Sequence, residues 1–308
     1  PQFRAYYDIH LGKKRNFIGS LFTTVEREEL PFYSNNVDIG NYHHSFFTGG
    51  LGFRQSLGIN NHIGADFYYR YGTLKLSQNI KEVEPGLEYL DNFIFRGPEL
   101  ALIYQHNSYD SYLYPTRGSH VKLKYKQAFK TGYIANFSVP DSIEFEDQFK
   151  EVMDPYWHLT ADLENYLPLG NKVSLNSGIA AGLSSDEKPF PDNYYIGGHG
   201  YNLRANQVAF IGFHNHELLH GNYLKGKLAL QLEPFPNLYA SVLANLIFVA
   251  DELDAFMENV LSFGDEDRYF GMGAGITYKT PVGPISIFYG SRTDVWNPIW
   301  YTSIGFTF

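Results

Sequence analysis

The 308-residue sequence contains no cysteine, which excludes disulfide bonds and thiolate chemistry. It also has no long apolar run. The longest, Leu246 to Ala250, is far shorter than the roughly 20 residues that a membrane-spanning helix needs. Basic residues are not in excess, and the net charge of -9 argues against a nucleic-acid partner. The Gly-x-Ser-x-Gly motif of serine hydrolases does not occur.

Aromatic residues, in contrast, are abundant. They make up 17% of the chain, with 25 tyrosines and 25 phenylalanines. Tyr and Trp gather at headgroup level in membrane β-barrels, so this composition fits such a protein. The mean hydropathy of -0.28 is no objection, because half of each barrel strand is polar. Two fold classes remain, a soluble β-sandwich or barrel and a membrane β-barrel.

Apolar and polar residues alternate with a period of two along most of the chain. In residues 270–278 the even positions are apolar and the odd positions are glycine or threonine. Residues 156–168, 223–234 and 299–308 alternate in the same way. No amphipathic helix is predicted that could cover so many apolar faces, so lipid is the simplest cover. The sheet must then close, because hydrocarbon cannot satisfy an open edge. The sequence predicts an all-β transmembrane antiparallel β-barrel.

Turn residues divide the chain into predicted strands. Thirteen are expected, over residues 2–12, 15–25, 43–58, 62–75, 97–109, 119–130, 156–168, 171–184, 223–234, 238–250, 268–279, 284–292 and 299–308. Short connections alternate with long ones. The long connections are 26–42, 76–96, 131–155, 185–222, 251–267 and 293–298. Outer-membrane barrels have short periplasmic turns and long external loops, which gives the expected orientation.

An odd number of strands is unusual, because bacterial single-chain outer-membrane barrels have even numbers. We therefore expect about 16 strands in a complete protein, of which 13 are visible here. On this interpretation residues 1–308 are one outer-membrane barrel domain. Its first strands, and any periplasmic or enzyme domain, are expected before residue 1.

The segment from Tyr194 to Arg204 resembles the long sixth external loop of the BamA superfamily of bacterial surface antigens. In that family a Gly-Gly pair, matched here by Gly197 and Gly198, precedes a Val-Arg-Gly motif. Here the motif reads Leu-Arg-Ala at residues 203–205, with one extra residue after the glycine pair. The resemblance implies a barrel whose long external loop, residues 185–222, folds into the lumen.

Other segments resemble the same superfamily. Tyr114-Pro115-Thr116-Arg117-Gly118 is similar to its Phe-Pro-Thr-Asp/Arg-Gly turn, after which eight strands run to the end. The turn at residues 280–284 resembles its Ser-Pro-Leu-Gly-Pro turn. Phe308, with Phe306, is similar to its carboxy-terminal barrel signal. Pro234-Phe235-Pro236 and residues 209–224 resemble the barrels at the carboxy end of patatin-like phospholipase proteins.

The resemblance also implies a lock for the loop, in which the loop arginine pairs with an acidic or polar group on the inner wall. Arg204 matches the arginine, and the usual aspartate position falls near Asn245. A neutral partner would weaken the lock, so Glu164, Asp162 or Glu233 could take its place. The alternative is that Arg204 is an ordinary solvated loop residue, which is the default for arginine.

A second motif points to different chemistry. His216-Glu217-Leu218-Leu219-His220 matches H-E-x-x-H, which on a helix aims two imidazoles at zinc and uses the glutamate as a general base. The segment is short for a helix and leads directly into a strand. The competing interpretation is a polar loop segment inside the lumen. Our main interpretation contains no metal, no cofactor and no catalytic residue within the chain.

The function expected is that of a bacterial outer-membrane barrel that anchors an attached or partner protein domain, or exports or assembles one. Its expected partners are outer-membrane lipid, the barrel-assembly machinery and a passenger or partner protein, with no nucleic acid. A patatin-like lipase domain would precede residue 1 if the protein is an enzyme. The alternatives are an open diffusion pore or transporter, and a zinc hydrolase using the H-E-x-x-H segment.

Overall fold

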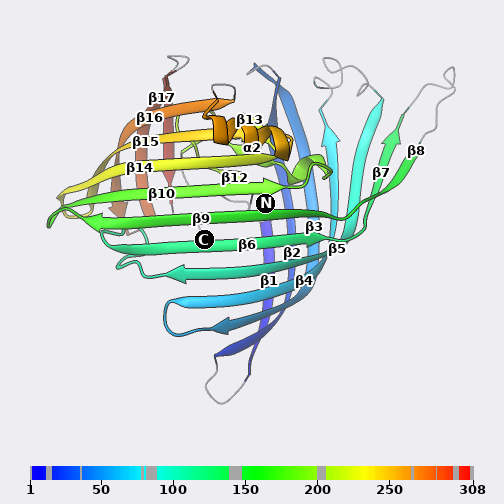
Figure 1. Cartoon of the computed structure of the whole chain (residues 1–308), viewed down its shortest axis with the longest axis horizontal. Coiled ribbons are helices and arrows are strands. Elements are labelled where there is room, and N and C mark those ends of the chain that lie inside the picture. The colour runs from blue at the N-terminus through cyan, green and yellow to red at the C-terminus, as the bar shows by residue number, and fades with distance from the viewer. Residues whose placement is uncertain are drawn as a thin grey trace. The chain divides into compact units, whose positions relative to one another are not determined.

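The computed structural model describes residues 2–11, 16–34, 37–77, 80, 89–138, 148–199, 206–264, 267–281, 283–293 and 298–305. Hydrogen bonds join fifteen strands of these residues into one large sheet (Figure 1). Its main path follows chain order, β1-β2-β3-β4-β5-β6-β9-β10-β14-β15-β16-β17-β18, with β7 and β8 beside β5. The all-β class expected from the alternation is confirmed. In the described ranges no helix has the length and apolar character needed to cross a membrane.

The chain divides into two compact units, and three strands contribute residues to both. The first unit comprises residues 1–104, 124–158 and 187–192. Its strands are β1 (Gln2–Leu11), β2 (Phe17–Ser34), β3 (Val37–Ser56), β4 (Asn61–Leu76), β7 (Thr131–Phe137) and β8 (Gln148–Met153). The shared strands are β5 (Leu90–Asn107), β6 (Gly118–Ala128) and β9 (Tyr156–Pro168).

The second unit comprises residues 105–123, 159–186 and 193–308. Its long strands are β10 (Val173–Ser184), β14 (Asn222–Phe235), β15 (Leu238–Ala250), β16 (Arg268–Thr280), β17 (Gly283–Arg292) and β18 (Ile299–Ile304). Each pairs antiparallel with its neighbour on this path. A helix, α2 (Leu253–Ser262), follows β15 and buries Phe256. The sequence did not predict this helix.

Each unit has one strongly exposed apolar face. In the first unit Leu21, Leu51 and Phe67 are paired across β2, β3 and β4, and each is at least half exposed. In the second unit Leu228, Leu230 and Leu232 stand in a row on β14 with exposures of 39–54%. Large side chains so exposed, on strand after strand, are not covered by any of the residues that the structure describes. This is the face that the alternation assigned to lipid.

Several strands are longer than predicted, which shortens the predicted loops. The expected loop 26–42 is a continuation of the β2–β3 hairpin, with Glu28 opposite His44 and Glu29 opposite His43. The expected loop 131–155 contains β7 and β8, and β5 begins at Leu90 inside the expected loop 76–96. In the β2–β3 extension Glu28 and Glu29 are paired with histidines across the strands, and hydrogen-bonding groups paired in this way stabilise a hairpin.

The long segment 185–222 is largely structured. It contains the 3-10 turn η1 (Phe190–Asp192) and the short strands β11 (Tyr194–Ile196), β12 (Gln207–Val208) and β13 (Leu218–His220). These strands form a separate sheet in the order β12-β11-β13. Residues 187–192 belong to the first unit and the rest of the segment to the second.

Candidate functional site

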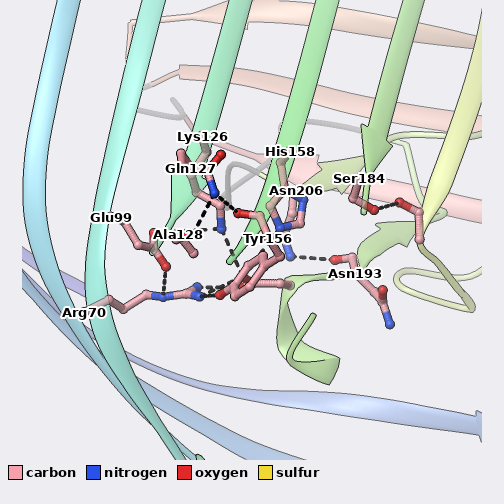
Figure 2. A network of polar contacts seen from close by, with 12 residues as sticks. Arg70, Glu99, Lys126, Gln127, Ala128, Tyr156, His158, Ser184, Asn193 and Asn206 are labelled. Atoms are coloured by element: carbon pink, nitrogen blue, oxygen red, sulfur yellow. Dashed lines mark hydrogen bonds and ion pairs between the residues drawn. The ribbon is translucent and has the colours of Figure 1, made fainter. Parts of the chain in front are cut away.

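In the first unit, Asp192 of η1 is bound by side chains from three strands of the sheet. Arg70 of β4 donates two parallel hydrogen bonds to its carboxylate, with Nη1–Oδ1 at 2.5 Å and Nη2–Oδ2 at 2.7 Å. Lys126 of β6 donates to Oδ2 at 3.0 Å, and the hydroxyl of Tyr156 on β9 donates to it at 2.9 Å. Glu99 of β5 accepts from Arg70 Nε at 2.8 Å. Figure 2 shows Arg70 reaching Glu99 with Lys126 and Tyr156 beside it.

This cluster is buried and its formal charges balance. Asp192 is 5% exposed and Glu99 is 2% exposed. Burial alone would raise the pKa of Asp192, but Arg70 and Lys126 hold it well below the ordinary value. A two-pronged arginine–carboxylate pair fixes geometry as well as energy. The cluster therefore holds η1 to the first unit at a defined position.

In the second unit, Asn245 of β15 binds the loop through the backbone. With its amide oxygen facing the Ile211 N–H, Asn245 accepts at 2.9 Å, and its amide nitrogen donates to Gly271 O at 3.0 Å. In this orientation both groups of the amide are satisfied. Asn245 is 5% exposed. The position that matched the aspartate of the BamA superfamily thus contacts the loop, at Ile211.

The residues around Ile211 are held by three more strands. Lys225 of β14 donates to Ala209 O at 3.0 Å. The hydroxyl of Tyr301 on β18 accepts from the Gly212 N–H at 2.8 Å and donates to Phe213 O at 2.9 Å. The guanidinium of Arg292 on β17 lies 4.2 Å from the centre of the Phe213 ring. Loop residues 209–213 are therefore bound along their backbone.

Glycines of β16 and β17 leave room for the close approach of Ile211. A Cβ atom on Gly273 of β16 would lie 2.3 Å from Ile211 Cδ1, and one on Gly290 of β17 would lie 2.4 Å from Ile211 Cγ1. A Cβ on Gly271 would lie 2.0 Å from Ile211 O. Glycine in a strand interior often marks such a close approach of another backbone. This packing explains Gly271 and Gly273 of β16, whereas a Cβ on Gly275 would lie 2.4 Å from the Phe288 ring.

Apolar residues of segment 194–213 form a buried core with residues of β14 and β15. Tyr194, Ile196, Phe210 and Phe213 are at most 2% exposed and pack in one cluster with Ile247 and Val249 of β15 and Tyr223 of β14. These strand residues lie on the face opposite the exposed leucines of β14. The loop therefore covers the face that would otherwise meet water.

Gly197 and Gly198, singled out from the sequence, have positive φ values of 134° and 79°. A Cβ on Gly197 would lie 2.0 Å from His214 O, and one on Gly198 would lie 1.9 Å from Asn215 Oδ1. Both glycines therefore permit the tight packing of β11 on the turn at 213–215. Arg204 lies outside the described residues, as do Phe306 and Phe308.

The other residues predicted for the lock have different partners. Glu164 accepts from Lys227 Nζ at 2.5 Å and from the Tyr109 hydroxyl at 3.0 Å. Asp162 lies two residues before it on the same face of β9. Glu233 accepts from the Asn237 N–H at 3.1 Å and so stabilises the short β14–β15 turn.

The H-E-x-x-H segment does not form a helix. His216 lies in a turn with φ of 60°, and His220 ends β13. Glu217 accepts from the His214 N–H at 2.6 Å and lies 3.9 Å from Arg292 Nη1. His220 Nδ1 is 3.2 Å from Asp251 Oδ1. The described residues contain no group of three or more His, Cys, Asp or Glu side chains arranged to hold a metal ion. The spacing therefore does not produce the zinc geometry of the motif.

One of the comparisons with solved structures supports this architecture. Among solved structures, BamA from Haemophilus ducreyi lacking POTRA domains 1-3 is similar, with a TM-score of 0.65 and 14% identity over 98% of this chain. CdiB from Acinetobacter baumannii has a TM-score of 0.44, with 13% identity over 98% of this chain and 55% of that one. The translocator domain of the autotransporter NalP from Neisseria meningitidis has a TM-score of 0.36, with 14% identity over 91% of this chain and 79% of that one.

The BamA structure shows the fold, a large antiparallel β-barrel, and this chain spans 62% of its length. No curated protein gives a significant match. The sequence model of the OMP85 superfamily matches residues 99–308, more than half of the chain. The chain therefore belongs to the OMP85 superfamily of outer-membrane β-barrels.

Proposed function

We propose that this chain is a bacterial outer-membrane barrel that anchors an attached or partner protein domain, or exports or assembles one. In this proposal segment 185–222 closes the lumen. The observation that carries it is the fixation of this segment at two places, Asp192 in the first unit and residues 209–213 in the second. A free, solvated loop would not form a buried ion pair or pack closely against glycines of the strands. Family membership supports an assembly or export role.

The partner that we consider first is a hydrolase domain of the patatin type. Its support is the resemblance of Pro234-Phe235-Pro236 and residues 209–224 to the barrels of such proteins. The wall residues that bind residues 209–213 would then keep the lumen closed beside the attached domain. Membrane lipid and the barrel-assembly machinery are the other partners that we propose, since lipid must cover the exposed apolar face and a barrel must be inserted.

Conductance in planar bilayers tests this proposal. The intact chain is expected to conduct weakly, and deletion of residues 187–220 is expected to raise the conductance severalfold. A deletion of residues 252–264, which removes α2 from another long connection, is the matched control and should leave conductance low. High conductance of the intact chain would favour an open pore or transporter instead.

A further inference from the structure

The first unit contains an apolar pocket of about 620 Å³ that the proposed function does not use. It is lined by strands β2, β4, β5, β7 and β8 and by residues 188–190 of the long segment. Six of the fourteen residues that line it are aromatic, among them Phe32, Phe93, Tyr133, Phe149 and Phe190. The Phe93 and Tyr133 rings are in edge contact with centres 3.8 Å apart. A pocket of this volume and lining is large enough for a small molecule or several side chains.

The pocket lies on the face of the sheet that does not meet lipid. Leu74 and Leu76 line it and have the same parity on β4 as Arg70, which binds the buried Asp192. The exposed Phe67 and Tyr69 have the opposite parity and point to the other face. Phe93 likewise shares its side of β5 with Phe95, whose ring lies 4.9 Å from the Arg70 guanidinium. Acyl chains of the surrounding bilayer therefore do not reach this pocket.

Strand β8, which forms one wall, also has a free edge. In the described part of the chain it pairs with β7 alone. Five of its six residues are exposed. Such an edge presents unpaired N–H and C=O groups that another strand can bind. Phe149 lines the pocket, whereas Val152 lies on the opposite face of the strand and is 62% exposed.

We propose that β8 and this pocket together bind an extended peptide segment of a partner protein. The edge supplies backbone hydrogen bonds, and the pocket receives apolar side chains at alternate positions of the peptide. Only a peptide satisfies both features, because a lipid or small apolar ligand would leave the strand edge unused. Since β8 lies in the long connection 131–155, the partner binds from the outside. This rests on the proposed function, an outer-membrane barrel, with the long connections on the external side as the sequence predicts.

The probe for this site is a fluorescent nine-residue peptide that alternates valine or phenylalanine with threonine or lysine. Its binding to the full chain in lipid nanodiscs is measured by anisotropy. Phe149→Ser is expected to weaken binding at least tenfold, whereas Val152→Ser, the matched control on the same strand, should change it less than twofold. Two N-methylated versions, each blocking one alternate set of backbone N–H groups, should differ, with one losing binding.

Several outcomes would overturn the proposal. One is equal binding of both N-methylated peptides and the parent, which would show that no strand is added. Another is equal loss in both serine variants. Binding of decanoate but not peptide in a Phe149-dependent manner would make the pocket an acyl-chain site. A dimer of the chain that excludes the peptide would make β8 a self-contact. None of these outcomes depends on conductance, so the proposed closure of the lumen is tested separately.

Discussion

Arg70 and Asp192 are 122 residues apart in the sequence and form a two-pronged ion pair with Nη1–Oδ1 at 2.5 Å and Nη2–Oδ2 at 2.7 Å. The side chain of Asp192 is 4% exposed and that of Arg70 is 14% exposed. The pair joins a barrel strand to the long loop segment. The pair therefore helps to fix the position of the loop segment on the sheet.

Asp192→Ala is expected to destabilise the protein and release η1. Removing one partner of a buried pair leaves a charge in excess, here one positive charge because Arg70 and Lys126 then face Glu99 alone, at a cost of about 3–5 kcal/mol. The expected results are a lower thermal transition in detergent and faster proteolysis within residues 185–222.

The matched control for this variant is Asp66→Ala. Asp66 also forms a two-pronged pair, with Arg54 at 2.6 and 2.7 Å, but it joins two strands and Arg54 is 35% exposed. This variant should lose less stability and leave loop proteolysis unchanged. Equal proteolysis of the two variants would show that Asp192 does not hold the loop.

Asn245→Ala is expected to weaken the second anchor. It removes an acceptor from Ile211 N–H and a donor from Gly271 O in a buried place, which costs about 1–3 kcal/mol. Asn245→Asp retains the acceptor but has no donor for Gly271 O, so it should also lower stability. Chemical denaturation followed by tryptophan fluorescence measures both variants. Wild-type stability of the aspartate variant would contradict the amide orientation described here.

Much of the fold could be predicted from alternation. Strands 156–168 and 238–250 are observed with those bounds. The β2–β3 hairpin was predicted too short because the charges of Glu26 to Glu29 resemble a loop. In the structure Glu29 accepts a hydrogen bond from Asn41 Nδ2 at 3.0 Å across the hairpin. A charge run has no period-two signal when both faces of a strand extension are polar.

The anchors were only partly predictable. Asn245 was identified through the family resemblance, but its contact Ile211 was not. Two features of the sequence indicate the contact in retrospect. One is the glycine pair Gly271 and Gly273, and the other is the unbroken apolar run Leu246 to Ala250, since a strand covered on both faces loses its alternation. The Arg70–Asp192 pair has no comparable signal, because residues so far apart share no local pattern.

Gly290→Ala should destabilise the second anchor through Ile211. The added Cβ would lie 2.4 Å from Ile211 Cγ1 and 2.7 Å from Cδ1, and overpacking of this kind costs about 1–3 kcal/mol. Since the clash is with a side chain, Ile211→Ala should rescue it. The double variant should therefore be less destabilised than the sum of the single variants. The cycle is completed by measuring the thermal transitions of the wild type, the two single variants and the double variant. Strict additivity would mean that Gly290 is not required for the packing of Ile211.

Lumen closure should weaken as the pH falls from about 6.5 to 4. Burial, together with the charge of Lys227, lowers the pKa of His199 to about 4, and its ring lies 3.7 Å from that of Phe288. A released loop would return this pKa to about 6.5, so the released state binds more protons in this window and gains population by at most about tenfold per pH unit. The lowered pKa of Asp192 makes stability depend on pH only below about pH 3.8, the ordinary pKa of an aspartate, which is outside this window.

Bilayer conductance between pH 7 and 4 measures this effect. Openings should become more frequent toward low pH in the wild type. His199→Phe keeps an aromatic ring against Phe288 but cannot titrate, so its openings should change less over the same range. Because Asp192→Ala leaves His199 in place, it should open more at every pH and still show the wild-type slope. If the phenylalanine variant kept that slope, the proton uptake would have to be assigned to another group.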